Sequence, residues 1–333
     1  MDMAVARYWV KEGDKVRCGL CPHSCLIAVG RRGICGVREN VQGTLEALTY
    51  GMVSSMHLDP MEKKPLYHFK PGQTVLSFGS VGCNMGCQHC QNFSISQTGP
   101  ETYALRPLQP EEIPLLVKNH NCRSVAWTYN EPTIWHEFVT DASRLCKQQG
   151  MSVVFVSNGY IQEAPLRDLE GVVDAMNIDV KAFHDDFYKG ICKAKFAPVV
   201  RTVEVAHEIG IHVELTYLII PGKNDDAQEL KRFCEWAQGI DPEIPVHFSR
   251  FHPDYKMTDV PATPMKTMEM AHRSAQEAGL KFIYLGNMRS SAEDTTCPDC
   301  GSTVIRRSYY DVEMVEYDNG RCRRCGRSLG IVP

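Results

Sequence analysis

The chain has 333 residues, of which 43% are hydrophobic and 23% charged, and it carries a formal net charge of −4. These values are those of an ordinary soluble protein, and the longest apolar runs, such as LTYLII, are too short to cross a bilayer. The weak net charge excludes a chain-wide basic surface for nucleic acid. The N-terminus lacks a charged start followed by an apolar core, so we expect no secretory signal and a cytoplasmic protein.

Fifteen cysteines are many for such a chain, and their grouping gives them their meaning. Eleven form three groups: Cys18, Cys21, Cys25 and Cys35; Cys83, Cys87 and Cys90; and Cys297, Cys300, Cys322 and Cys325. Close CxxC spacing suits metal ions better than disulfides, which usually staple small secreted domains. We expect the other four to be small core or surface residues. They are Cys122, Cys146, Cys192 and Cys234.

Residues 1–71 form a Cys-rich N-terminal segment with frequent glycine turns. Its metal-binding pattern consists of Cys18, Cys21, Cys25 and Cys35. Four thiolates can hold zinc, or a fully ligated [4Fe–4S] cluster that relays electrons, and the mixed spacing does not decide between the metals. We favour zinc or another structural metal, with His23 a substitute ligand at best.

Residues 72–290 alternate short apolar runs with longer amphipathic ones. The expected strands are TVLSF (74–78), SVAWTY (124–129), SVVFVS (152–157), AMNIDV (175–180), HVELTYLII (212–220), VHFSRF (246–251) and KFIYLG (281–286). Helical patterns lie between most of them, such as residues 134–150 and 225–239. Strands alternating with helices imply a parallel sheet. The pattern predicts an α/β fold with a full or partial (β/α) barrel, whose chemistry sits at the C-terminal ends of the strands.

The CxxxCxxC run of Cys83, Cys87 and Cys90 directly follows the first of these strands. A [4Fe–4S] cluster has four irons, so three thiolates leave one iron open to bind a small molecule. A structural zinc site usually has four protein ligands, whereas this run offers three. A CxxC redox pair would use two of the three thiols and leave the third without a role. The run therefore predicts a cluster that does chemistry rather than one that only passes electrons.

Together with this run, further segments of the chain resemble one known enzyme family. They are LCPHSC and GICGVREN near the start, DPMEKKPLYHFKPG, CQNFSISQ, TYNEPT, SNGY, NIDVKAF, IIPGKND, HFSRFHPDYK and the cysteine-rich end. With them the chain resembles radical S-adenosylmethionine (radical SAM) enzymes along nearly its whole length. The resemblance is closest to the pyruvate formate-lyase activating enzyme-like branch. Within that branch the chain is similar to the radical SAM member of the AmmeMemoRadiSam group.

The resemblance implies a [4Fe–4S] cluster whose open iron binds the amino and carboxylate groups of SAM. One electron then breaks a C–S bond, and the 5′-deoxyadenosyl radical abstracts hydrogen from a substrate in a dry pocket. A flavodoxin or ferredoxin is implied as the low-potential electron donor, and Memo-like and AMMECR-like proteins as functional partners. The resemblance does not decide the substrate. It can be a protein glycine, as for a glycyl-radical-enzyme activase, or a metabolite, or a nucleic-acid base.

The same resemblance implies residues that bind SAM. Beside the catalytic Cys83, Cys87 and Cys90 they are Asn130, Glu131, Ser157, Asn158, Asp179, Lys181 and His252. Tyr129, Asn130 and Glu131 stand where a Gly-Gly-Glu motif commonly holds the amino group, and the two missing glycines leave the backbone conformation of this loop undecided.

Four of these residues have a simpler alternative role. Glu131 can be the solvated start of a helix, Asp179 and Lys181 can form a structural ion pair, and His252 can be a structural histidine. His89 stands where the family usually has an aromatic residue, and we expect it to pack rather than to bind metal.

Residues 291–333 contain two CxxC knuckles separated by 21 residues. Cys297, Cys300, Cys322 and Cys325 predict a zinc ribbon, with a strand hairpin in SYYDVEMVEY (308–317) between the knuckles. A rubredoxin-like iron or an auxiliary iron–sulfur cluster is the alternative. For the whole chain, the competing hypothesis is an iron–sulfur electron carrier or a zinc-dependent scaffold without SAM chemistry. It leaves the missing fourth ligand and the long βα body unexplained.

Overall fold

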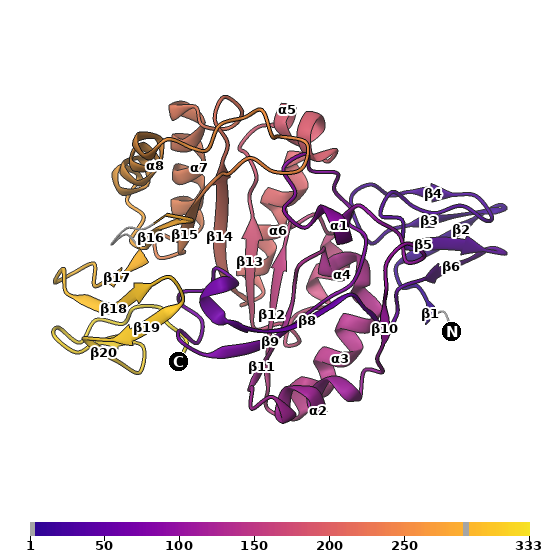
Figure 1. Ribbon diagram of the computed structural model, residues 1–333, viewed down its shortest axis with the longest axis horizontal. Helices are drawn as coiled ribbons and strands as arrows, with labels where there is room; N and C mark the ends of the chain where they lie inside the picture. The colour runs from indigo at the N-terminus through magenta and orange to yellow at the C-terminus, as the bar shows by residue number, and fades with distance from the viewer. Residues whose placement is uncertain (1–3, 289–292) are drawn as a thin grey trace.

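One open eight-stranded sheet organises the protein, for which the computed structural model describes residues 4–288 and 293–333 (Figure 1). Its strands, in spatial order, are β16 (Ile283–Gly286), β15 (Val246–Arg250), β14 (His212–Ile219), β13 (Ala175–Asp179), β12 (Ser152–Ser157), β11 (Ser124–Trp127), β9 (Thr74–Gly79) and β8 (Ser55–Pro60). All of them pair in parallel except β8, which runs antiparallel to β9. Within the described residues β8 and β16 are the two edges, so the barrel is partial. The seven expected strands are confirmed.

Helices connect the parallel strands, as the amphipathic patterns predicted. They are α1 (Phe93–Ser96), α2 (Glu112–Asn119), α3 (His136–Gln148), α4 (Glu163–Arg167), α5 (Asp185–Phe187), α6 (Phe196–Glu208), α7 (Ala227–Ile240) and α8 (Met265–Ala278), with the short turns η1 (Met61–Lys63), η2 (Pro132–Trp135) and η3 (Tyr188–Cys192). Helix α7 begins at Asp226, whose carboxylate accepts hydrogen bonds from the backbone nitrogens of Gln228 and Glu229 at 3.0 Å. Helix α8 ends at Gly279, where a φ of +93° suits a residue without Cβ.

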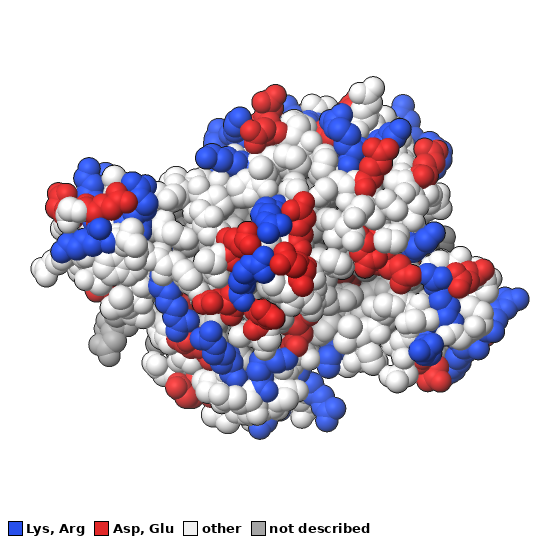
Figure 2. Space-filling model, turned by 180° about the vertical axis from the view of Figure 1, so that it is seen from behind, with Lys and Arg blue, Asp and Glu red and all other residues white. Residues whose placement is uncertain are grey.

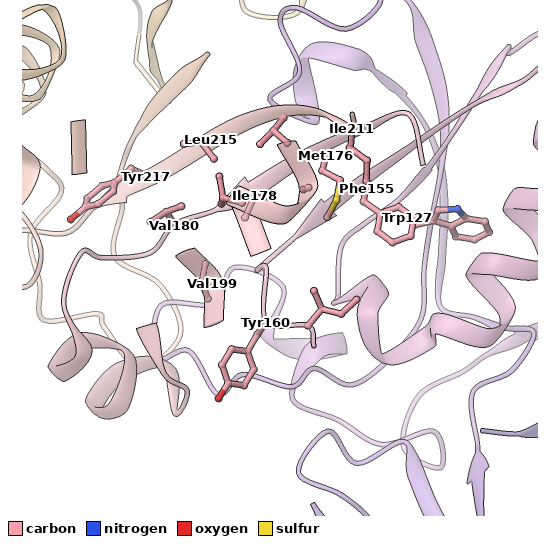
Figure 3. Packing of buried hydrophobic residues seen from close by; sticks show 14 of the residues in the cluster. Trp127, Phe155, Tyr160, Met176, Ile178, Val180, Val199, Ile211, Leu215 and Tyr217 are labelled. Carbon is pink, nitrogen blue, oxygen red and sulfur yellow. The ribbon is translucent and has the colours of Figure 1, made fainter. Parts of the chain in front are cut away.

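The main hydrophobic core lies between this sheet and its helices (Figure 3). Trp127, Phe155 and Met176 occupy paired positions on β11, β12 and β13 and are buried next to one another. The Trp127 indole donates a hydrogen bond to Ser143 Oγ of α3 at 2.8 Å, which satisfies its polar atom. Burial of each such side chain contributes about 1.5–3 kcal/mol. The core therefore holds β11, β12 and β13 together and attaches them to α3.

Two small antiparallel sheets form the N-terminal lobe, drawn in indigo in Figure 1. One contains β1 (Ala4–Val5), β6 (Thr44–Ala47) and β5 (Arg38–Val41), and the other β2 (Trp9–Glu12), β3 (Lys15–Cys18) and β4 (Leu26–Ile27). A short pair, β7 (Met52–Val53) and β10 (Arg106–Pro107), follows. The buried guanidinium of Arg38 forms an ion pair with Glu137 of α3, which also accepts from the backbone nitrogen of Arg7 at 2.6 Å. These contacts attach the lobe to the partial barrel.

The C-terminal module packs beside the β8 edge and β16 (Figure 1). Its strands are β17 (Thr295–Thr296), β18 (Thr303–Ser308), β19 (Asp311–Met314), β20 (Tyr317–Asp318) and β21 (Arg321–Cys322). The hairpin turns at residues 309–310, so its first strand begins before the segment that the sequence predicted. The buried Arg307 attaches the module to the barrel. Its guanidinium donates to the Tyr67 carbonyl at 2.8 Å and to Thr295 Oγ1 at 2.7 Å.

On the face in view, the surface shows no gathering of charges of one sign. Among the described residues, no helix is both long and apolar enough to cross a bilayer. Figure 2 shows basic and acidic side chains interspersed on that face rather than separated by sign. This distribution gives no continuous basic surface there for a polyanion.

A buried carboxylate in β14 joins several parts of the structure. Glu214 accepts hydrogen bonds from the backbone nitrogens of Tyr67 and His68 at 2.9 and 2.7 Å. It also accepts from Nε2 of His247 at 2.7 Å and of His212 at 3.1 Å. Burial raises the pKa of Glu214, but the two histidines outweigh it and hold that pKa well below its usual range. The segment between β8 and β9 is thereby fixed against two parallel strands.

Replacing Glu214 by Gln should lower the free energy of unfolding at neutral pH by about 3 kcal/mol, because the amide removes a charge and an acceptor. The folded pKa lies below the ordinary value of 4.5, so this stabilisation is present above pH 4.5 and is lost as the pH falls toward the folded pKa. Urea unfolding at a series of pH values should show that the difference in free energy of unfolding between wild type and E214Q becomes smaller as the pH falls. Glu235→Gln, at an exposed helix position, is the control. A gap that stays constant with pH would contradict this account.

Candidate active site

A cavity of about 500 Å³ lies at the C-terminal ends of the parallel strands. Nine of the sequence-predicted residues line it: Cys83, Cys87, Cys90, Asn130, Glu131, Ser157, Asn158, Asp179 and Lys181. They come from the ends of β9, β11, β12 and β13 and the loops that follow. The topology therefore brings together side chains up to about a hundred residues apart in sequence, at the face where parallel α/β folds gather ligands.

The cysteine loop follows β9 and is closely packed by its neighbours. A Cβ on Gly82, whose φ is +85°, would lie 2.7 Å from the carbonyl oxygen of Cys35, so only glycine fits there. Cys83 Sγ accepts from the backbone nitrogen of Met85 at 3.4 Å, and Cys90 Sγ lies 3.1 Å from Ser96 Oγ. The loop thus presents its thiols from a fixed backbone.

The trio has one cysteine neighbour from elsewhere in the chain. A hydrogen bond with the Cys192 thiol, together with the Lys181 charge, lowers the pKa of Cys87. Cys192 is fully buried and does not line the cavity that the trio faces. It was expected only as a core residue. It ends η3 and contacts the trio through Cys87.

The loop after β11 keeps an unusual backbone without glycine. Tyr129 has a φ of +71°, a conformation that costs an ordinary residue about 1–2 kcal/mol. Its hydroxyl donates to Asp59, and Lys64 Nζ lies 4.7 Å from its ring centroid. Asn130 Oδ1 accepts from the backbone nitrogen of Ser80 at 3.0 Å and ties this loop to the cysteine loop. The sequence left the backbone conformation of this loop undecided, and the structure shows that side-chain contacts hold it.

Glu131 is buried and not solvated. Its Oε1 accepts from Ser157 Oγ at 2.8 Å and from the backbone nitrogen of Thr133 at 3.0 Å, and its Oε2 accepts from the backbone nitrogen of Asn158 at 2.8 Å. Burial raises the pKa of this carboxyl. Glu131 caps η2 and joins the ends of β11 and β12 while it lines the cavity.

Asp179 and Lys181 form the ion pair that was the simpler of their two expected roles. Lys181 Nζ lies 2.9 Å from Asp179 Oδ2, and the side chains are 14% and 35% exposed. Both also line the cavity, so the ion pair is structural and accessible to a ligand at once. Nearby, His89 is buried with its ring 5.9 Å from that of Phe187, and burial lowers its pKa to about 3.

His252 lies away from the other predicted residues. It is exposed and lines an adjoining cavity of about 780 Å³. The two cavities share the lining residues Lys63, Pro65, Gln91, Thr216, Ser249, Asn287 and Tyr310. The lining of the adjoining cavity also includes Arg307 and Tyr310 of the C-terminal module. Sequence reasoning did not anticipate that this module borders the site.

His247 lines the adjoining cavity, and behind it the buried Glu214 accepts its hydrogen bond; sequence reasoning missed this pair as a unit. One signal was available. A glutamate in the middle of the apolar run HVELTYLII is costly unless it is hydrogen-bonded, and a histidine in the next strand could supply the partner. The pairing itself could be known only from the strand register.

The other two cysteine groups are also assembled. In the C-terminal group, Cys297 Sγ lies 3.5 Å from Cys325 Sγ and Cys300 Sγ lies 3.6 Å from Cys322 Sγ. All four sulfurs lie within 4.8 Å of one another, which fits a tetrahedral ion with metal–sulfur bonds of about 2.3 Å. The N-terminal group lines one small cavity that also includes His23 and Arg38.

Comparisons with known proteins agree with this geometry. Residues 78–234 match the model of the Radical SAM superfamily. An uncharacterized protein of Methanocaldococcus jannaschii is 45% identical over 335 residues, which cover 99% of this chain and all of that protein. The chain belongs to the radical SAM superfamily.

Two further relatives define the branch and the fold of this radical SAM protein. Pyruvate formate-lyase 1-activating enzyme of Escherichia coli K12 is 23% identical over 64% of this chain and 93% of its own length, which supports the activating enzyme-like branch. The crystal structure of a radical SAM methyltransferase from Sphaerobacter thermophilus, 14% identical, superposes with a TM-score of 0.53 over 87% of this chain and 79% of that chain. This second likeness concerns the fold alone.

Replacing Cys300 by Ser should remove one zinc ion per chain and unfold the C-terminal module, because structural zinc contributes on the order of 10 kcal/mol to such modules. Elemental analysis and differential scanning calorimetry measure the two effects. Cys122→Ser, at a buried position outside the three groups, should change neither. Unaltered zinc content in C300S would exclude the four-cysteine zinc site.

Proposed function

We propose that this protein is a radical SAM enzyme that cleaves SAM reductively and abstracts hydrogen from a substrate in the adjoining cavity. One observation carries the proposal. The three thiols of the cysteine loop face the same cavity as the carboxylate, amide, hydroxyl and ammonium groups at the ends of three further strands. A site with three thiolates and many polar groups suits a cluster with an open iron and a charged ligand.

The residues of the cavity fit both groups. When bound, the cluster and SAM supply one-electron cleavage of a C–S bond and a 5′-deoxyadenosyl radical. We assign Lys181 to the carboxylate of SAM, and Asp179 orients the Lys181 ammonium. Glu131 is assigned to the amino group of SAM. The hydroxyl and amide groups after β12 are assigned to the ribose. Burial of these side chains keeps water from the reacting atoms.

The adjoining cavity is our candidate for the substrate site. Its volume of about 780 Å³ lies within the usual range for small-molecule pockets. Its walls combine the imidazole of His247, the Arg307 guanidinium and the ring of Tyr310, which together suit a polar substrate with a planar part. Tyr310 and Asn287 border both cavities, so a substrate there would lie next to SAM.

Glycyl-radical-enzyme activation is the second candidate, supported by the alignment with the Escherichia coli enzyme. A protein glycine would have to enter past the C-terminal module that walls the adjoining cavity. A small polar molecule needs no such passage, and we therefore favour it. A flavodoxin or ferredoxin as reductant follows from the family, and a link with Memo-like and AMMECR-like proteins rests on the AmmeMemoRadiSam resemblance.

The triple variant C83A/C87A/C90A should form no 5′-deoxyadenosine above background after anaerobic reconstitution, reduction and addition of SAM, because it lacks the cluster ligands. Chromatographic quantification of 5′-deoxyadenosine measures this. Cys192→Ser is the matched control, since its thiol contacts Cys87 but does not line the cavity. It should retain cleavage. Loss in C192S comparable to that of the triple variant would instead favour a fully ligated cluster and an electron carrier.

Replacing Lys181 by Met should raise the Kd for SAM about tenfold, equivalent to about 1.4 kcal/mol, because a charge-assisted contact to the carboxylate is lost. Equilibrium dialysis with reconstituted protein gives the value. Lys189→Met is the control, because that ammonium pairs with Asp185 on the surface at 2.7 Å. Equal affinities in the two variants would remove Lys181 from the SAM site.

A further inference from the structure

We propose that Cys18, Cys21, Cys25 and Cys35 bind a second [4Fe–4S] cluster, fully ligated, which passes electrons to the cluster at Cys83, Cys87 and Cys90. The relay rests on the proposed function, whereas the second cluster itself does not. The sequence alone left this site open between zinc and a cluster, and the spacing and surroundings of the thiols distinguish the two.

The four cysteines converge from three segments of the N-terminal lobe. Cys18 ends β3, Cys21 and Cys25 lie in the turn before β4, and Cys35 precedes β5. The backbone nitrogen of Cys18 donates to the Cys25 carbonyl at 2.9 Å, which closes the turn. A Cβ on Gly33 would lie 3.6 Å from Cys25 Sγ, so the loop opposite also packs against the thiols. All four line the same small cavity.

The spacing of the thiols favours a cluster over a single ion. One tetrahedral zinc ion draws four sulfurs tightly around a point, as in the C-terminal group. Among residues 4–288 and 293–333, that group is the one set of three or more potential ligands close enough for a single ion. Neither the N-terminal group nor the catalytic trio forms such a set. A cube of four irons and four sulfides carries its thiolates on separate corners and does not need four sulfurs gathered around one ion.

A buried cation supplies a second, independent observation. Arg38 is 1% exposed and lines the cavity. Its Nη2 is used by Glu137 and by the Arg7 carbonyl at 3.2 Å, but its Nε and Nη1 are buried without a hydrogen-bond partner. Buried guanidinium donors are normally satisfied. The thiolates of an anionic metal site at these cysteines would accept from the two atoms, and the sulfides of a cluster would add further acceptors.

The histidine in the pattern is not free to replace a thiolate through its outer nitrogen. His23 Nε2 lies 2.7 Å from the carbonyl oxygen of Asn84 and is used in that hydrogen bond. This leaves four thiolates for four irons. No iron is then open, so the group cannot bind SAM and is suited to electron transfer.

The N-terminal group adjoins the catalytic loop directly. His23 contacts Asn84, the residue after Cys83. On the other side, the backbone of Gly82 packs so closely on Cys35 that a Cβ would meet its carbonyl oxygen at 2.7 Å. Ile34, next to Cys35, is 64% exposed and lines the same cavity, so the group also reaches the surface. These contacts form a continuous route from the surface to the catalytic loop.

The electron balance of the relay is simple. A reduced ferredoxin or flavodoxin gives one electron to the N-terminal cluster and is itself oxidised. That electron passes to the catalytic cluster and then to the sulfonium of SAM, where the C–S bond breaks to give methionine and the 5′-deoxyadenosyl radical. The N-terminal cluster returns to its oxidised state and makes or breaks no bond itself.

The decisive experiment uses the full chain carrying C83A/C87A/C90A, in which only the N-terminal group can hold a cluster if the C-terminal group holds zinc. After anaerobic reconstitution, we expect about four irons and four sulfides per chain. On reduction, the protein should give a [4Fe–4S] electron paramagnetic resonance signal that SAM does not alter. Iron-free protein with zinc at both four-cysteine groups would overturn the proposal. Wild-type SAM cleavage is measured separately, so failure of the proposed function remains distinguishable.

A second variant tests the assignment and the relay together. C21S/C25S should lower the iron content from about eight to about four per chain. It should reduce 5′-deoxyadenosine formation at least tenfold with reduced flavodoxin, but less than twofold with dithionite, which can reach the catalytic cluster directly. C122S/C146S is the matched control. Unchanged iron content in C21S/C25S would overturn the assignment, and equal losses with both reductants would overturn the relay. Should C21S/C25S fail to fold, the iron content of C83A/C87A/C90A decides alone.

Discussion

Hydrogen bonds of three asparagine side chains, two of them buried, hold the cysteine loop, and the rest of the site depends on them. Asn84 donates to the Tyr160 carbonyl at 2.7 Å and accepts from Asn158 at 2.9 Å. Asn130 accepts from the backbone nitrogen of Ser80 at 3.0 Å. The loops after β9, β11 and β12 thereby become one unit. Loss of one such partner leaves a buried polar group unpaired, at a cost of about 1–3 kcal/mol.

The features that the sequence predicted are those encoded locally. Seven apolar runs, each near an amphipathic segment, were enough to predict the parallel strands, and a CxxxCxxC run after a strand was enough to predict where the cysteines lie. Because parallel strands end at one edge, Ser157 and Lys181 could be expected near Cys83 without knowledge of any contact. The resemblance added the branch of the family, which the relatives support.

The features that the sequence did not predict depend on contacts between distant segments. No local pattern relates Glu214 to His247 or places Arg307 against Tyr67, yet these contacts shape the adjoining cavity. The positive φ of Tyr129 is likewise invisible in a sequence that lacks the usual glycines, because its support comes from Asp59 and from Lys64, far earlier in the chain. His252 follows the expected strand, but it lies at the larger cavity.

The central claim is that an iron of the cluster at Cys83, Cys87 and Cys90 is open and binds SAM. Electron–nuclear double resonance on the reduced wild-type protein, with SAM carrying ¹⁵N in its amino group, tests it most directly. The account predicts a ¹⁵N coupling to the cluster spin that disappears when unlabelled SAM replaces the labelled compound. A reduced [4Fe–4S] signal with saturating SAM and no such coupling would contradict it.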